Sequence, residues 1–482
     1  MQEILIGGNE ATQIIMNAAM GNRHGMISGA TGTGKTVTLQ ILAEGYSRLG
    51  VPVFMADIKG DLSGIAKQGK AHEKISERIE SIKIIDFEFR ANPTVFWDIF
   101  AQNGHPVRTT ISDMGPLLLS HLLELNDTQS GVLYSCFKIA DEQGLLLLDL
   151  KDLRSMLSWM ADNAKELSSD YGNISSASVG AMQRRLLVLE EQGASHFFGE
   201  PAIQIDDFCR TDFSGNGVIS ILDATDLTSK SPRLYAAFLL WLLSDLFETL
   251  PEVGDADRPK LVLFFDEAHL LFDRAPRVLI DKIEQIVRLI RSKGVGVYFI
   301  SQSPLDIPED ILGQLGLKIQ HALRAYTPKD RKTIKAVAET FRSNPKLDTE
   351  TVIKELKTGE ALVSVLNTDG SPTPVERILI RPPESRIGAL SAAERTEGIA
   401  RSPYKDRYDQ SIDRESAYEM LKQKAEHMAE QAAQQEKPET RRSSGRQSAG
   451  EALLKSAARS IGSQIGRQII RGIMGSLFAG KR

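Results

Sequence analysis

Cysteine is almost absent from this chain of 482 residues, which holds only Cys136 and Cys209. Two cysteines supply neither a disulfide framework nor a zinc cluster, and we interpret both as small apolar core residues in the reducing cytoplasm. Long hydrophobic runs are also missing, since the longest uncharged one, from Leu234 to Leu243, is about half of the ~20 residues that a membrane span needs. The N-terminus lacks the basic-then-apolar layout of a signal peptide. The sequence therefore predicts a cytoplasmic protein without a membrane span, and does not favour a membrane as its partner.

The chain as a whole has no excess of positive charge, because 58 Lys and Arg are set against 63 Asp and Glu, for a formal net charge of −5. Bulk composition therefore does not predict nucleic-acid binding. The charge is unevenly placed, however, since residues 437–482 contain ten Lys or Arg and two Asp or Glu. This asymmetry indicates a basic tail that meets an anionic target or a neighbouring acidic surface.

Short apolar runs bounded by turn residues alternate with helical patterns at 35–48, 232–249 and 276–292. Such alternation favours a mainly parallel α/β sheet. A hairpin with its turn at 367–372 is expected within 359–381. The runs predicted as strands are Met26–Ser28, Val51–Ala56, Ile82–Phe87, Val218–Asp223, Leu261–Phe265, Val295–Ser301 and Leu317–Leu323.

Three stretches depart from this alternation. Residues 110–200 carry long apolar helical patterns, which we interpret as a helical insertion into an α/β domain spanning 1–383. Residues 384–450 are polar and predict a helical and disordered linker. Residues 451–482 combine isoleucines at a spacing of four with arginines and glycines, which indicates a basic amphipathic C-terminal helix that needs a partner to fold. That partner is its own domain, a neighbouring subunit, a membrane surface or DNA.

The most informative segment fits G-x-x-x-x-G-K-[ST] and reads Gly29, Ala30, Thr31, Gly32, Thr33, Gly34, Lys35 and Thr36. Its glycines let backbone N–H groups approach phosphate oxygens, Lys35 supplies charge to the β- and γ-phosphates, and Thr36 offers a hydroxyl to Mg²⁺. An apolar run precedes the loop, and helical spacing begins at Val37, so the loop points a helix N-terminus at the anion. An accidental glycine-rich turn is the alternative. Residues 29–37 thus predict a site for ATP and Mg²⁺.

Two further apolar runs end in polar residues. Leu261–Phe265 is followed by Asp266 and Glu267, which would reach the carboxyl edge of the sheet, where ligands bind. Asp266 is predicted to hold Mg²⁺ and Glu267 to orient and deprotonate the attacking water, unless both only cap the next helix. Val297–Ser301 is followed by Gln302, which contacts the γ-phosphate or the water if its strand lies beside the Asp266 strand. A loop glutamine without a role is the alternative.

With these motifs in this order, the chain resembles the HerA/FtsK superfamily of ring-forming, DNA-translocating ATPases, and within it an uncharacterised HerA-like branch found in bacteria. The resemblance covers about 1–383 and rests on the loop at 29–36, on Asp57-Ile58-Lys59-Gly60-Asp61, on Asp266-Glu267 and on Ser301-Gln302. It implies a RecA-like P-loop fold, a homo-hexameric ring with ATP at the subunit interfaces, DNA as a partner, and an arginine supplied by the neighbouring subunit.

In the family, one such arginine lies shortly before the glycine loop, where Arg23 matches. Another precedes the strand that carries Gln302, where Arg291 matches best and Arg288 next. For both, an ordinary surface residue is the alternative. HerA proteins usually carry an N-terminal β-barrel, for which the 28 residues before Gly29 are too few, and this leaves a nuclease partner open. The resemblance predicts an ATP-hydrolysing motor that translocates on or unwinds DNA. The alternatives are a nucleotide-gated oligomeric scaffold and a motor acting on protein at a membrane surface.

Overall fold

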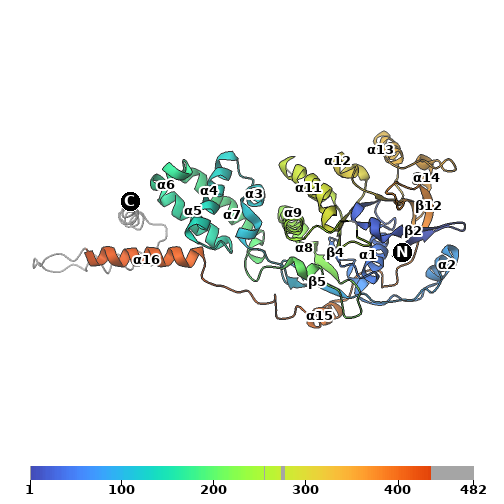
Figure 1. Cartoon of the computed structure of the whole chain (residues 1–482), viewed down its shortest axis with the longest axis horizontal. Helices are drawn as coiled ribbons and strands as arrows, with labels where there is room; N and C mark the ends of the chain where they lie inside the picture. Colours follow the sequence, from blue (N-terminus) through green and yellow to red (C-terminus); the bar gives the residue numbers. More distant parts are fainter. Residues whose placement is uncertain (1, 255, 273–276, 436–482) are drawn as a thin grey trace, which may run out of the picture. The chain divides into compact units, whose positions relative to one another are not determined.

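The computed structural model describes residues 2–254, 256–272 and 277–435. They fall into two compact units (Figure 1). The α/β unit comprises residues up to 107 together with 203–410, and the helical unit comprises 108–202 together with the described residues from 411 onward. The predicted helix at 451–482 and the linker residues 436–450 lie outside the described residues. The predicted domain boundaries stay predictions.

The described part of the α/β unit is built on one twelve-stranded sheet in the order β2-β1-β12-β11-β10-β3-β9-β8-β4-β7-β5-β6. The strands from β10 to β6 in this order run parallel, and the other pairs are antiparallel. Their bounds are β1 Glu3–Gly8, β2 Gln13–Asn17, β3 Gly25–Ser28, β4 Val53–Asp57, β5 Thr94–Asp98, β6 His105–Pro106, β7 Ile219–Asp223, β8 Leu261–Phe265, β9 Val295–Ser301, β10 Leu317–Gln320, β11 Glu360–Ser364 and β12 Glu376–Ile380.

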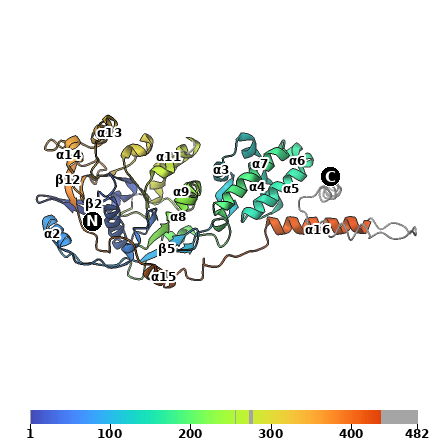
Figure 2. The same cartoon turned by 180° about the vertical axis from the view of Figure 1, so that it is seen from behind.

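Helices of the α/β unit connect these strands, and α15 lies beside β5 in both views (Figures 1 and 2). The α-helices of this unit are α1 Lys35–Arg48, α2 Glu73–Ile82, α8 Thr225–Lys230, α9 Pro232–Thr249, α10 His269–Phe272, α11 Arg277–Ile290, α12 Glu309–Leu312, α13 Pro328–Glu339, α14 Thr349–Glu355 and α15 Ala392–Ala400. The unit also contains the short 3₁₀ helices η1 Ala18–Arg23, η5 Arg291–Lys293 and η6 Pro304–Asp306.

The central strands are buried on both faces. Successive side chains of a strand point to opposite sides, so each face needs its own covering layer. In β4, Val53 and Met55 belong to the core cluster that includes Leu39 and Leu42 of α1. Phe54, between them, contacts Phe238 of α9 with ring centroids 6.3 Å apart. This two-sided burial explains why the parallel strands read as continuous apolar runs in the sequence.

One predicted strand is wrong. Ile82 is the last residue of the amphipathic helix α2, and residues 83–87 that follow form no strand. Ile82 is fully buried at the end of α2 whereas Ile85 is 84% exposed, so the apolar run does not enter the sheet. The strand in this part of the chain is β5, at Thr94–Asp98, and β1 and β2 were also not predicted. The hairpin is confirmed, since β11 and β12 pair antiparallel.

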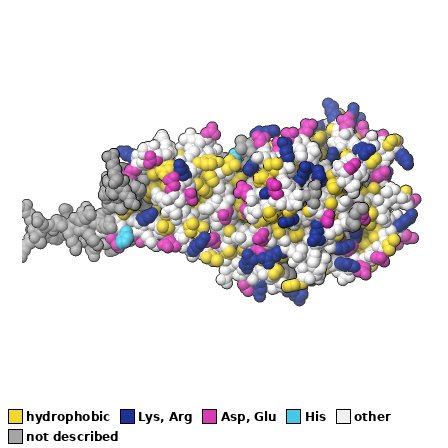
Figure 3. Space-filling view, viewed as in Figure 1, with side chains coloured by type: hydrophobic (Ala, Val, Ile, Leu, Met, Phe, Trp, Pro, Cys, Tyr) yellow, Lys and Arg dark blue, Asp and Glu magenta, His cyan; other side chains and the backbone are white. Residues whose placement is uncertain are grey.

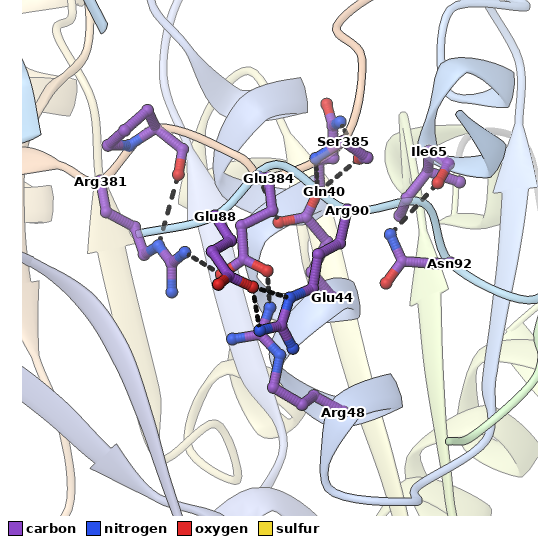
Figure 4. Close-up of polar contacts among 11 residues, drawn as sticks. Gln40, Glu44, Arg48, Ile65, Glu88, Arg90, Asn92, Arg381, Glu384 and Ser385 are labelled. Carbon is purple, nitrogen blue, oxygen red and sulfur yellow. Dashed lines mark hydrogen bonds and ion pairs between the residues drawn. The ribbon is translucent and has the colours of Figure 1, made fainter. Parts of the chain in front are cut away.

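Residues 384–410, which we call the C-terminal strap, begin against helix α1. Both oxygens of the buried Glu44 carboxylate accept backbone N–H groups at 2.9 Å, from Glu384 and from Ser385, and the Ser385 hydroxyl also donates to Glu44 (Figure 4). The Glu384 carboxylate in turn pairs with Arg48 and, at 2.6 Å, with Arg381. Burial raises the pKa of Glu44, although the bonds from Ser385 oppose this. The helix that follows the glycine loop is therefore tied to the strap.

We expect Glu44→Gln to lower the free energy of unfolding by about 2 kcal/mol, because the amide turns a donor toward the backbone N–H groups and leaves a buried pair unsatisfied. Urea unfolding followed by circular dichroism measures this. The matched control is Glu77→Gln on the exposed face of α2. Equal midpoints for the two variants would contradict the role of Glu44.

The helical unit consists of α3 Ile111–Leu122, α4 Asp127–Gln143, α5 Leu150–Asp162, α6 Ala164–Tyr171, α7 Ser176–Glu191 and α16 Ala417–Gln435. Helix α16 begins on α5, where Asp152 accepts the Ser416 hydroxyl at 2.6 Å and the Tyr418 N–H at 2.9 Å. Among the described residues, no helix combines the length and the apolar character that crossing a membrane requires.

Candidate nucleotide site

The glycine loop connects β3 to α1 and is held by backbone hydrogen bonds from three sides. Gly29 N–H donates to Ser301 of β9 at 3.3 Å, and Ala30 N–H donates to Ala322, after β10, at 2.9 Å. The Gly359 N–H, just before β11, donates to Thr33 at 2.9 Å. The loop is thus shaped by the ends of strands that lie far apart in the sequence.

Glycine is required where this loop passes its neighbours. Gly29 has φ +150° and Gly34 has φ +118°, which L-residues with a side chain rarely adopt. A Cβ on Gly29 would also lie 2.5 Å from the Cβ of His321. Thr31 and Gly32 form the exposed tip, and Thr36 and Val37 lie half-buried in the first turn of α1.

The Lys35 ammonium turns back onto its own loop, where it donates to the carbonyl oxygens of Gly29 at 2.6 Å and Ala30 at 3.2 Å. Lys35 is only 6% exposed, and this burial lowers its pKa. The charge of Lys59 lowers the pKa further, whereas the carboxylates of Glu267 and Asp266 raise it. The loop lysine and the acidic doublet therefore lie within electrostatic reach of each other.

The sheet order explains how the doublet arrives there. Strand β9 lies between β3 and β8, so the loop after β3 and the residues after β8 meet at one carboxyl edge. Asp266 is 5% exposed, and burial raises its pKa to about 6 although Lys59 opposes the shift. The neighbouring strand β9 also accepts the Ala268 N–H at 2.8 Å through Ile300, which fixes the chain just past the doublet.

Glu267 has an unusual environment. Its backbone is left-handed, with φ +44°, which is uncommon for a residue with a long side chain and is found at functional sites. One carboxylate oxygen, Oε1, lies 2.6 Å from Lys59 Nζ. The other, Oε2, is 3.4 Å from His269 Nδ1 and makes no hydrogen bond to any residue that the structure describes. The side chain is thus buried, and only one of its two carboxylate oxygens has a close partner.

Gln302 directly follows β9 at the same edge, and its side chain is exposed. The neighbouring Ser301 hydroxyl donates to Asp306 of η6 at 2.5 Å, and Asp306 also interacts electrostatically with Lys35. Strand β9 pairs with both β3 and β8, which is the arrangement on which the prediction for Gln302 depends. Its role stays a prediction.

Sequence reasoning missed His321, which lies beneath the glycine loop. Its ring contacts the Thr38 hydroxyl at 2.8 Å and the Glu360 carbonyl at 3.0 Å. Burial lowers its pKa to about 4, so the ring is neutral at pH 7. The available signal was its place at the end of an apolar strand, the same signal that singled out Gln302. The same reasoning also missed Asp306 and the pairing of Lys59 with Glu267.

The donor set at this edge fits Mg²⁺. Thr36 offers a hydroxyl and Asp266 a carboxylate, and Mg²⁺ in nucleotide sites typically takes one or two protein ligands of this kind together with phosphate oxygens and waters. No cluster of three or more His, Cys, Asp or Glu suited to a metal occurs in the described ranges. The site therefore suits a metal that is completed by the nucleotide.

The structure does not bring Arg23 or Arg291 to the glycine loop of the same chain. Arg23 ends η1, before β3, and Arg291 begins η5, before β9, so both lie at the amino edge of the sheet. Both act on the buried His24: burial lowers the pKa of His24 to about 4, and the charges of Arg291 and Arg23 lower it further. The Asn22 side chain also donates to the Arg291 carbonyl at 3.3 Å.

Comparison with known proteins gives a similar sequence and similar structures. The DNA double-strand break repair helicase HerA of Sulfolobus acidocaldarius is 22% identical over 366 residues, which are 74% of this chain and 65% of that protein. The chain thus matches just under two thirds of this curated relative's length. The bacterial conjugative coupling protein TrwB, without its first 70 residues, is 16% identical with a TM-score of 0.52 and covers 81% of this chain and 92% of its own.

VirB4 of Thermoanaerobacter pseudethanolicus is 17% identical, with a TM-score of 0.48, and covers 81% of this chain and 98% of its own. The likeness to TrwB confirms the predicted α/β fold of the RecA-like P-loop type. The family described as "Helicase HerA-like C-terminal" matches residues 2–482. The protein is therefore a member of the HerA-like helicase C-terminal family.

Proposed function

We propose that this protein is a Mg²⁺-dependent ATPase that assembles into a ring and translocates on or unwinds DNA. The observation that carries the proposal is the convergence of Lys35, Asp266 and Glu267 at one carboxyl edge, although the lysine and the doublet are more than 200 residues apart in sequence. Two separate motifs that meet in this way supply the parts that phosphoryl transfer to water needs.

The residues divide the work as follows. Lys35 exchanges its bonds to the loop carbonyls for bonds to the β- and γ-phosphates, because phosphate oxygens are stronger acceptors than carbonyls for an ammonium. Thr36 and Asp266 would hold Mg²⁺, which would neutralise charge on the phosphates. Glu267 orients the attacking water and takes its proton, and Gln302 contacts the γ-phosphate or the water.

Ring assembly is supported by the positions of the two arginines. Strand β9 has seven residues, so Arg291, before its start, and the loop edge, at its end, are separated by about 20 Å. An arginine side chain does not span such a distance, which argues against Arg291 serving the site of its own chain, and Arg23 lies at the same amino edge of the sheet. A role in the site of a neighbouring copy, like that of the arginine supplied in trans in other phosphoryl-transfer enzymes, is the proposal that fits this position.

DNA as the polymer rests on the family and on the HerA relative, whose name states a DNA helicase. The surface charge supports it only weakly, because on the face of the α/β unit in Figure 3 Lys and Arg are interspersed with Asp and Glu. Contacts between a ring motor and DNA are mainly to the phosphate backbone. Binding of this kind does not require a sequence-reading module.

The decisive experiment is a titration of ATPase activity with single- and double-stranded DNA at several salt concentrations, with the mass of the assembly measured in the presence of nucleotide. We expect turnover to rise with DNA, the rise to weaken as salt increases, and the mass to correspond to six chains. Nucleotide-dependent assembly without any response to either DNA would favour the oligomeric scaffold. Stimulation by liposomes in place of DNA would favour the membrane-surface motor.

A further inference from the structure

The buried carboxylate of Glu267 has its closest partner on a neighbouring strand. Lys59 lies two residues after the end of β4, which pairs with β8, and its Nζ is 2.6 Å from Glu267 Oε1. The Lys59 side chain is 37% exposed, whereas that of Glu267 is 9% exposed. The predicted catalytic base is therefore held by a cation that solutes can approach from the surface.

The backbone that carries Lys59 is fixed. The Asp57 carboxylate accepts the N–H groups of Gly60 at 2.7 Å and Leu62 at 3.1 Å, which closes the turn around Lys59. The following residue, Ser63, accepts the Leu390 N–H of the C-terminal strap through its hydroxyl at 2.9 Å. Because the turn is tied at both ends, the lysine side chain is the part that can rearrange without unfolding the loop.

The ion pair works against hydrolysis. A general base must turn toward the water and take its proton, and an ammonium 2.6 Å from Oε1 holds the carboxylate in place and opposes its protonation. The left-handed backbone at Glu267 indicates that this arrangement is held by its surroundings. The other carboxylates near Lys59, Asp266 and Asp61, attract the same ammonium. The nearby Lys35 ammonium donates instead to the carbonyl oxygens of its own loop.

Resting on the proposed ATPase function, we propose that Lys59 is a positioning residue that restrains Glu267 and releases it when a phosphate group competes for the Lys59 ammonium. A compact ammonium with three donors suits a phosphate oxygen. The competing phosphate comes from the bound nucleotide or from the polymer backbone, and the chemistry at Lys59 is the same in both cases.

Lys59→Gln tests this through the ATPase rate without DNA. Loss of a partly exposed ion pair is expected to raise the basal kcat about three- to tenfold. The KM for ATP and the affinity for a fluorescent ATP analogue are measured alongside, to separate release of the base from a change in nucleotide binding. This affinity is expected to stay unchanged if the polymer backbone releases Lys59 and to fall if a nucleotide phosphate binds Lys59. Lys59→Arg keeps the positive charge and is expected to remain near the wild-type rate.

Lys67→Gln is the matched control, because Lys67 lies on the same segment, is 40% exposed and makes a looser pair at 3.7 Å with Glu397. The double variant Lys59→Gln/Glu267→Gln should be as inactive as Glu267→Gln alone, which shows that the extra turnover passes through Glu267. A basal rate in Lys59→Gln that is unchanged or lower than in the wild type overturns the proposal.

Adding DNA identifies the source of the phosphate. If Lys59→Gln is fast without DNA and gains little from it, the polymer backbone releases Lys59. If the variant is fast and is still stimulated by the wild-type factor, the nucleotide releases it, and both results support the restraint. Absence of turnover in both the wild type and Lys59→Gln overturns the proposed ATPase function together with the restraint.

Discussion

Glu267→Gln is expected to lower steady-state ATP hydrolysis by about 10²- to 10⁴-fold, the usual contribution of a general base. The glutamine keeps the size of the side chain and a carbonyl oxygen but does not accept a proton from water. Nucleotide binding should survive, because Lys35 and the backbone N–H groups of the glycine loop are unchanged. The measurement is a coupled ATPase assay together with titration of a fluorescent ATP analogue.

The control for this variant is Glu309→Gln, which makes the same chemical change on the exposed helix α12. It should hydrolyse ATP at the wild-type rate. Full activity in Glu267→Gln would show that another group activates the water, and the assignment of the acidic doublet would then fail. Loss of nucleotide binding together with activity would instead indicate a structural role for Glu267.

The glycine loop and the acidic doublet were predictable because each is a local pattern with a direct physical cause. A G-x-x-x-x-G-K-[ST] loop requires glycines where the backbone turns, and Gly29 and Gly34 do have positive φ values. The apolar run before Asp266 predicts a buried strand, and β8 is that strand. The carboxyl ends of parallel strands then meet at one edge, whatever the order of the strands.

The remaining features depend on the order of the strands, which the sequence does not disclose. The pairing of Lys59 with Glu267 requires β4 to lie beside β8, and the contact of His321 with the glycine loop requires β10 to lie beside β3. The erroneous strand at Ile82–Phe87 has a different cause. A short apolar run is compatible with a helix end as well as with a strand. In the structure Ile82 is the buried last residue of α2, and the residues after it form no strand.

Mixing two inactive variants should restore ATP hydrolysis if Arg23 or Arg291 acts on a neighbouring site. Substitution of the acting arginine by alanine is expected to lower turnover by about 10³-fold or more, because the charge on the transferring phosphoryl group loses its stabilising partner. Lys35→Ala is expected to be inactive for an independent reason, since its own glycine loop no longer contacts the phosphates. Each variant keeps the component that the other lacks.

In a ring, a subunit that lacks the arginine but keeps Lys35 forms a complete site when its neighbour is the Lys35→Ala subunit. Random assembly at a ratio of one to one makes about a quarter of the interfaces complete, so roughly a quarter of the wild-type rate should return on mixing. An arginine that acted within its own chain would give no recovery, because every subunit would then carry a lesion in its own site. The opposite sheet edges occupied by the arginines and the glycine loop favour recovery. An arginine variant that keeps full activity before mixing is a surface residue, and if both do, the trans site must use another cation.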